Sequence, residues 1–465
     1  MSPEEWRDSL NARLDARRPS IEHREAYYEG VHRLAFATSK FREAFGTLFS
    51  AFSDNWCGVV VDAAVERLEV QGFRFGDDDA DEDAARIWQA NNLDAGSAIA
   101  HETAIATSES SLLVSPNPDD DDTPRITVEH PSQMIVASSP ADHRHREAAF
   151  KKWVDDDGHA MATLYLPDGI YKWRTRDKWK GGKKPKWTLR DADGEEDGYA
   201  GENPLGIVPV VPLLNRPNMR GEGRSDLDGV IPQQDAVNKL VADMLVASEF
   251  AAFRQRWAAG IEVPVDPETG EPIRKVFDAA LDRIFAVGNE DAKFGTFEAT
   301  ELGNYVKAIE MVVQHIAAQT RTPPHYLLGQ SGAFPSGESL KATETGLVAK
   351  VRRKMVTFGE SHEEAMRLAF RLIGDDDKAE ALDAETIWRD PESRTESQVV
   401  DALTKMKDLG VPRKALWQRW GASPAEMTRW EAWAREEGQQ TASEDFSRVF
   451  GPTGQGLPDE PVTTE

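Results

Sequence analysis

Residues 332–339, GAFPSGES, have the spacing of a phosphate-binding P-loop, in which two glycines separated by four residues precede a lysine and a serine or threonine. In that motif, backbone amides at a helix N-terminus cradle phosphates while the lysine neutralises the terminal phosphate. Here Glu338 occupies the lysine position. The β-strand that must precede the motif is also missing, because a helical pattern ending at Pro323 and Pro324 comes before it. The sequence therefore argues against nucleotide binding.

The same eight residues have a structural interpretation. Ser336 is predicted to cap a long helix, and the Glu338 carboxylate in the first turn is favourable to the helix dipole. Gly332 and Gly337 favour a mobile loop before that helix. We therefore expect a loop that leads into a long helix and binds no cofactor.

Metal and catalytic sites are not predicted. His101 in HETAI and His362 in HEEAM each begin like a zinc-protease helix, but neither stretch has the second histidine. The acidic run DADGEEDG, 191–198, resembles a calcium loop but has Glu196 where the sharp turn needs glycine, so a hairpin turn is preferred. No Ser-His-Asp or Cys-His arrangement can be argued from spacing. We find no convincing enzyme site.

Two basic stretches could contact an anion. HRHR at 143–146 fits a solvated loop better than a binding site. KWKGGKKPKW at 178–187 interleaves aromatic and basic residues, as sites for single-stranded nucleic acid do. A twisted hairpin with its tryptophans packed on one face explains that stretch equally well, and we prefer this interpretation.

Composition limits the classes of protein to consider. A chain of 465 residues is expected to form roughly two to four packed units. The net charge of −26 disfavours a protein that reads or grips nucleic acid tightly. Cys57 is the single cysteine, which fits a reducing compartment, and no apolar signal core or membrane span is found. We expect a soluble protein made inside a cell, with Cys57 buried.

The elements that must position these residues change along the chain. Helices are indicated in residues 1–110, interrupted by the acidic run GDDDADED at 76–83, which we interpret as a solvated loop. Apolar residues alternate from about 111 to 215, as in β-hairpins. The proline-rich end of this part, PLGIVPVVPLLNRP, fits an edge strand or an extended crossing segment.

The second half is predicted to be mainly helical. A 3-4 apolar spacing indicates a helix that ends at Gly260, with Ser225 and Asp226 suited to cap a first turn. A small α/β insertion follows, and a second helix resumes at Leu302. A long helix with one apolar face is predicted at 339–373, followed by a strand at TIWRD and short helices.

The order of these parts is similar to that of portal proteins of long-tailed bacteriophages, the head-to-tail connectors found in phages of actinobacteria and other Gram-positive hosts. The resemblance covers about residues 20–435. Its most specific stretches are YYEG at 27–30, DNWCGVVVDAAVERLEVQGF at 54–73, GRSDLDGVIPQQDAVNK at 223–239 and RTPPHYLLG at 321–329. None is a catalytic signature, so the match is one of pattern and order.

The resemblance implies an α+β, mainly helical subunit of a ring, usually of twelve copies, through which DNA is packaged and ejected at one capsid vertex. The implied parts are an N-terminal wing of helices and β-hairpins (1–224), stem helix 1 (225–259), an α/β clip (260–300), stem helix 2 (301–321), a tunnel loop (322–338), the wing spine helix and strand (339–393), crown helices (394–440) and a tail predicted to be disordered (441–465).

Site residues also follow from the resemblance. The DNA-facing part of the tunnel loop would be Gln330, Ser331, Gly332, Ala333, Phe334, Pro335, Ser336, Gly337 and Glu338. The clip would dock terminase and the adaptor through Asp266, Glu268, Glu271, Arg274, Asp291 and Lys293. A sliding polyanion needs few phosphate contacts, and residues 322–339 contain no lysine or arginine. No catalytic residue, metal or cofactor is implied.

The implied partners are other copies of the chain, the terminase large subunit, the head-completion adaptor, the major capsid protein and scaffold, and double-stranded DNA passing non-specifically, with no membrane. The protein would be a virion component assembled in the host cytoplasm. Two alternatives stay open: another head-tail connector or minor capsid protein without a channel, and, less favoured, a nucleotide-dependent packaging enzyme. The basic cluster Lys350, Arg352, Arg353 and Lys354 could face DNA, but pairing with acidic neighbours is preferred.

Overall fold

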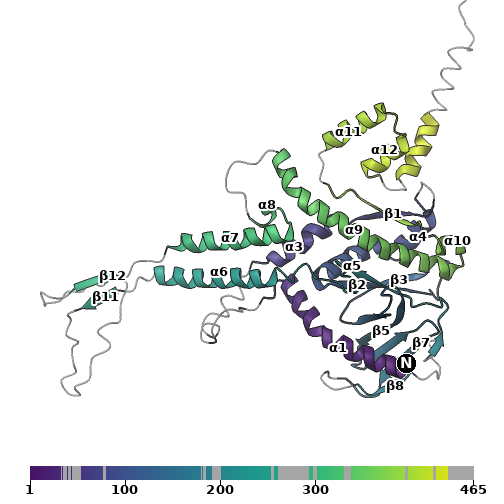
Figure 1. Ribbon diagram of the computed structural model, residues 1–465, viewed down its shortest axis with the longest axis horizontal. Coiled ribbons are helices and arrows are strands. Elements are labelled where there is room, and N and C mark those ends of the chain that lie inside the picture. The colour runs from purple at the N-terminus through teal and green to yellow at the C-terminus, as the bar shows by residue number, and fades with distance from the viewer. Residues whose placement is uncertain are drawn as a thin grey trace, which may run out of the picture. The chain divides into compact units, whose positions relative to one another are not determined.

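The computed structural model describes residues 1–32, 54–76, 80–179, 185–190, 200–252, 256–259, 293–296, 301–328, 337–392, 396–422 and 426–437, together with a few isolated positions. The chain divides into two compact units. Unit 1 consists of residues 1–25, 60–227 and 335–465, and unit 2 consists of 26–59 and 228–334. Over the described residues the chain is α+β with helix predominating, as predicted (Figure 1).

The largest sheet of unit 1 is antiparallel, with strand order β4-β5-β6-β7-β8 and β9 paired with β7. Its strands are β4 (Met134–Ser138), β5 (Arg146–Val154), β6 (Ala160–Tyr165), β7 (Gly169–Thr175), β8 (Trp187–Leu189) and β9 (Ala200–Glu202). These consecutive hairpins confirm the alternating pattern read from the sequence.

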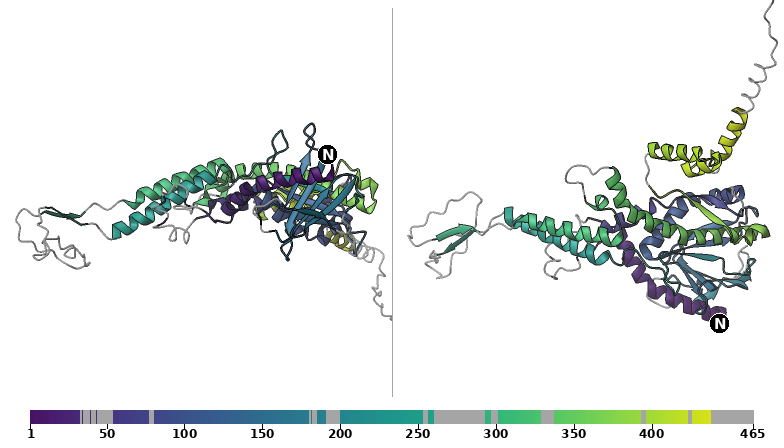
Figure 2. Two further views of the ribbon diagram at one scale, coloured as in Figure 1. Left: turned by 90° about the horizontal axis from the view of Figure 1, so that it is seen from below. Right: turned by 45° about the horizontal axis from the view of Figure 1, so that its top comes forward.

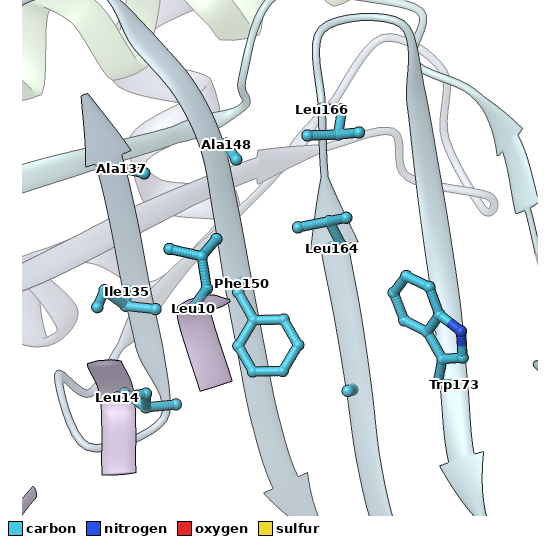
Figure 3. Packing of buried hydrophobic residues seen from close by; sticks show 10 residues of the cluster. Leu10, Leu14, Ile135, Ala137, Ala148, Phe150, Leu164, Leu166 and Trp173 are labelled. Atoms are coloured by element: carbon cyan, nitrogen blue, oxygen red, sulfur yellow. The ribbon is translucent and has the colours of Figure 1, made fainter. Parts of the chain in front are cut away.

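Helix α1 (Pro3–Tyr28) covers this sheet with its first half. Leu10 and Leu14 are fully buried in one apolar cluster with side chains from β4 to β7, among them Ile135, Phe150 and Trp173 (Figure 3). Lys152 on β5 is also buried, and its Nζ donates to the α1 carboxylate of Asp15 at 2.6 Å. The sequence pattern predicted helices in this part of the chain but did not single out α1.

A second sheet of unit 1 has strand order β10-β2-β3, formed by β10 (Val210–Leu214), β2 (Glu109–Ser115) and β3 (Arg125–Glu129). Helices α5 (Leu93–Thr107) and α9 (Gly337–Ile373) both contact all three strands. Pro212 of β10 is tolerated because β10 is an edge strand, one of the two predicted arrangements. The long helix α9 is also confirmed, with Leu347, Val351 and Phe358 fully buried on one face.

The remaining elements of unit 1 are shorter. Strand β1 (Val70–Arg74) pairs antiparallel with β13 (Glu385–Trp388), and α4 (Glu82–Ala90) is capped by the Asp81 side chain. Helix α10 (Asp376–Ala379) packs against α9. Helices α11 (Glu396–Asp408), α12 (Arg413–Trp420) and a helix at 426–437 follow. Left-handed Gly410 and Gly421 end α11 and α12.

Unit 2 is built on two helices, α6 (Ile231–Ala252) and α7 (Leu302–Thr320), which lie side by side in each view (Figures 1 and 2). An antiparallel strand pair follows α6 and precedes α7: β11 (Arg256–Ala259) and β12 (Lys293–Thr296). The unit also contains the start of α3 (Trp56–Val65) and the short α8 (Pro324–Leu327).

Three sequence predictions are corrected. The helix expected over 225–259 begins at Ile231 and ends at Ala252, because residues 256–259 pair with β12 instead of continuing the helical spacing. Residues 70–74, expected to be helical, form β1, because β13 offers a backbone partner from a distant part of the sequence. Ser225 and Asp226 do not cap a helix, and Asp226 is buried among cations.

Candidate functional site

Three of the stretches on which the resemblance rests meet in unit 2. Gln234 of α6, in the stretch at 223–239, binds the stretch at 54–73. The Gln234 side chain is fully buried. Its Oε1 accepts from the backbone N–H of Trp56 at 2.9 Å, and its Nε2 donates to the carbonyl of Asp54 at 2.8 Å. The first N–H groups of a helix lack intrahelical partners, so Gln234 caps α3 from a neighbouring helix.

The remaining one of these three stretches, YYEG at 27–30, is bound by the side chains of Asn55 and Asp235. Asn55 Oδ1 accepts from the N–H of Gly58 at 3.0 Å, while its Nδ2 donates to the carbonyl of Tyr28 at 2.6 Å. The Tyr27 hydroxyl donates to the Asp235 carboxylate. We call Tyr27, Asp54, Asn55, Gln234 and Asp235 the polar junction. It ties the end of α1, the start of α3 and the first turns of α6 together.

Beyond the first turns of α6, which belong to the polar junction, α6 and α7 pack as a helical pair. α6 buries Val237 and Val241, and α7 buries Val313 and Ile316. Gln233 Nε2 donates to Gln319 Oε1 between the two helices. Much of α7 is exposed, because only one stripe of its second half is buried. Such a helix pair is a narrow element with large surfaces left for further contacts.

In unit 1, the GRSD part of the stretch at 223–239 binds α9 through Asp226. Its Oδ2 lies 2.9 Å from Lys350 Nζ and 3.0 Å from Lys354 Nζ. Its Oδ1 accepts from Arg216 Nε at 3.0 Å and from Asn215 Nδ2 at 2.9 Å. Burial acts to raise the pKa of Asp226, but these cations and Asn215 outweigh it and hold the pKa well below its ordinary value. Burial lowers the pKa of Lys354 to about 8.

This arrangement confirms the preferred interpretation of the basic cluster on α9 for three of its members. Lys350 and Lys354 are paired with Asp226, and Arg352 lies 3.7 Å from Asp390 at the surface. Three of the four cations in this segment of α9 therefore contact acidic residues of unit 1.

The proposed tunnel-loop and clip residues lie largely outside the described residues. Of the loop, the structure describes only the backbone of Gly337 and Glu338, which are the first two residues of α9. Of the clip, it describes Lys293, which begins β12 and is exposed. Positions 330–336, Asp266, Glu268, Glu271, Arg274 and Asp291 therefore stay predictions.

The two zinc-protease-like histidines do come together, but as a pair. His101 Nε2 lies 2.8 Å from His362 Nε2, and both rings are buried against Phe358, Trp88 and Trp388. Burial lowers the pKa of His362 to about 3, and burial together with His362 lowers that of His101. Both rings are therefore neutral, and one N–H donates to the other ring nitrogen. Among the described residues no group of three metal-ligating side chains occurs.

The aromatic residues of KWKGGKKPKW contribute to packing. The buried Lys152 Nζ lies 4.9 Å from the Trp179 ring centroid, and Trp187 packs against the cluster beneath α1. This agrees with the hairpin interpretation. HRHR spans the end of the loop between β4 and β5 and the first residue of β5. His143, Arg144 and His145 in the loop are exposed, while Arg146 at the start of β5 is paired with Glu364 of α9 at 2.6 Å.

Sequence reasoning missed the polar junction and the buried Asp226. A usable signal was present for the first: Gln234 and Asn238 share a helix face with Val237 and Val241, where apolar side chains would be expected. Buried polar groups of this kind need partners, but the pattern does not say which residues supply them.

Comparison with known proteins points to one family. A family model described as "Phage portal protein, SPP1 Gp6-like" matches residues 7–440. A portal protein of Mycobacterium phage D29 is 33% identical over 461 residues, covering 93% of this chain and 88% of the relative. A portal protein of Mycobacterium phage L5 is 34% identical over 400 residues, covering 81% and 77%. Within the described residues, no helix has the length and apolar character to cross a membrane.

Proposed function

Because the chain belongs to the SPP1 Gp6-like family of phage portal proteins, we propose that it forms a closed ring of about twelve copies at one vertex of a phage capsid. DNA enters through the ring during packaging and leaves through it during ejection. Portal proteins are virion components and form a structural, non-enzymatic family. The observation that carries the proposal is the match over residues 7–440, which spans both units.

The helical pair of unit 2 supports a division of labour within the subunit. α6 and α7 are the stem, and the β11–β12 pair begins the clip that docks the terminase large subunit and later the head-completion adaptor. Unit 1 is the wing, with α9 as its spine, and the helices after residue 394 are the crown facing the capsid interior, near the major capsid protein and scaffold. Assembly takes place in the host cytoplasm.

Residues 322–338, which include α8 and lead into α9, are the tunnel loop at the channel constriction. From Thr322 to Ser339 it carries no lysine or arginine, so passing DNA would form few of the phosphate contacts that slow its movement. Of the basic residues of α9 that follow, Lys350 and Lys354 bind Asp226 within unit 1, which keeps these two from binding DNA phosphates. Double-stranded DNA is therefore a non-specific, weakly held passenger.

Native mass spectrometry with negative-stain images of the purified protein tests the proposal. We expect a closed ring with a central hole and a mass near twelve times the 51.7 kDa chain mass. A chain that stays monomeric with scaffold protein present, or one that binds ATP, would overturn the proposal. In assembled particles, replacing residues 330–338 with a neutral linker should alter packaging or DNA retention, and unchanged packaging would exclude this loop as the DNA contact.

A further inference from the structure

Two exposed loops of unit 1 pack directly against each other. The first joins β4 to β5 and is closed by a hydrogen bond from Ser139 N to His145 O of 2.8 Å. The second follows β10 and is closed by one from Arg224 N to Asn215 O of 2.7 Å. Gly221 in the second loop has φ +72°, and a Cβ there would lie 2.9 Å from the Cβ of His143 in the first. Only glycine satisfies both the backbone angle and this close approach.

The contact gathers arginines from both loops. Arg144, Arg220 and Arg224 are exposed, and within the described part of the chain none of the three forms an ion pair. Nearby arginines behave differently, because Arg146 is paired with Glu364 and Arg216 with Asp226. We call Arg144, Arg220 and Arg224, together with Met219, the arginine patch. Met219 directly precedes Arg220 in the chain.

Acidic groups within the two loops do not neutralise the arginine patch. Asp142 Oδ1 accepts from the backbone N–H of Arg144, and the Glu222 carboxylate accepts from Asn218 Nδ2. These contacts fix loop shape without engaging an arginine side chain. The result is a local excess of positive charge on a chain whose net charge is −26.

Met219 indicates what kind of partner fits the arginine patch. Its side chain is 98% exposed at the tip of the second loop. Arginine and methionine are both enriched in protein interfaces relative to the rest of the surface. A phosphate backbone would use the arginines but would leave the methionine without an apolar contact. The combination therefore favours an acidic protein surface over nucleic acid.

From these observations we infer that the arginine patch docks on an acidic surface of a second copy of this chain. The inference rests on the ring proposed above, because a ring joins unlike faces of neighbouring copies. Copies with a net charge of −26 repel each other, so a ring needs a local contact of opposite sign. At physiological salt the Debye length is about 8 Å, which lets such a contact outweigh the repulsion of distant charges.

Sedimentation velocity on the full chain tests this inference at about 0.05 M and about 0.5 M salt. The test variant combines Arg144→Glu, Arg220→Glu and Arg224→Glu. The matched control combines Arg174→Glu, Arg176→Glu and Lys178→Glu, which makes the same charge change on exposed residues in and just after β7. We expect the test variant to need at least about tenfold more protein for half-assembly at low salt, and the control to assemble like the wild type.

A second variant, Met219→Ser, keeps all charges and should weaken assembly at both salt concentrations. Equal assembly of the wild type, the charge variant and the methionine variant would overturn the inference while leaving the ring intact. Unchanged assembly with reduced affinity for a short DNA duplex would assign the arginine patch to nucleic acid instead. A wild-type chain that stays monomeric even with scaffold protein present would overturn both the inference and the proposed function.

Discussion

Lys354 Nζ lies 3.0 Å from Oδ2 of Asp226, and each of the two side chains is only 2% exposed. Lys350 and Arg216 contact the same carboxylate, so one buried negative charge holds three cations from the loop after β10 and from α9. Removing the carboxylate leaves those cations uncompensated, which costs more than removing an exposed pair. The joint between this loop and α9 therefore depends on a single residue.

Asp226→Asn should lower the free energy of unfolding by about 3–5 kcal/mol, because the buried lysines lose their counter-ion. Urea denaturation followed by tryptophan fluorescence measures this change. Asp119→Asn is the control, since it removes an exposed ion pair with Arg125 and should cost no more than about 1 kcal/mol. Equal costs for the two variants would show that Asp226 is not the counter-ion on which the joint depends.

The histidine pair should make unit 1 sensitive to mild acid. The pKa of His362 is about 3 in the folded chain against 6.5 for an ordinary histidine, and that of His101 is also lowered. Below about pH 6.5 the unfolded chain therefore binds protons that the folded chain does not, so stability is complete above this pH and is lost as the pH falls. With two such histidines, the free energy of unfolding falls with a slope of up to about 2.7 kcal/mol for each pH unit below this pH.

Urea denaturation between about pH 7 and pH 5 checks this acid sensitivity. His362→Gln keeps a hydrogen-bonding side chain beside His101 and removes one proton-binding group, so it should reduce the slope by about half. His315→Gln, on the exposed face of α7, is the control for replacing a histidine away from the buried pair. A wild-type slope in His362→Gln would contradict the prediction.

Periodic elements could be predicted because their signal is local. Helix α9 was expected at 339–373 and spans Gly337–Ile373, since Leu347, Val351 and Phe358 repeat along one face. Pro212 and the prolines flanking β10 predicted an edge strand or an extended crossing segment, and β10 is an edge strand. In both cases residues close in sequence decide the structure.

Elements that depend on distant partners were not predicted. β1 forms because Val70 and Arg74 pair with Trp388 and Glu385. Asp226 resembled a helix cap, since nothing adjacent in sequence reveals Lys350 and Lys354. Such a long-range contact is invisible to a pattern that repeats over a few residues. The same limit applies to the polar junction, where Gln234 meets Trp56.

The packing of α1 on the six-stranded sheet should be strongly weakened by a cavity in the cluster between them. Leu14→Ala removes a fully buried side chain from the cluster with Ile135 and Phe150 and should cost about 2–5 kcal/mol. Leu189→Ala, on β8, removes a side chain that is 41% exposed and should cost less than about 1 kcal/mol. Urea denaturation compares the two variants, and equal costs would mean that α1 contributes little to unit 1.

The second loop of the arginine patch, residues 215–224, depends on Gly223 for its close approach to Ser108, just before β2. A Cβ at Gly223 would lie 2.2 Å from the carbonyl oxygen of Ser108, and that oxygen also accepts the N–H of Asn215 at 3.0 Å. Because the obstructing atom belongs to the backbone, Gly223→Ala must move a strand end and weaken this bond. Asn215 in turn donates to Asp226, so the change should also disturb the joint with α9.

We expect Gly223→Ala to lower the free energy of unfolding by at least about 1–3 kcal/mol in urea denaturation. Gly303→Ala is the matched control, because a Cβ at this α7 position meets nothing within 4 Å. It should raise stability by about 0.5–1 kcal/mol through better helix propensity. In Asp226→Asn the joint is already broken, so adding Gly223→Ala should cost less than it does alone. Fully additive costs would show that the glycine acts only through the Ser108 contact and not through Asn215.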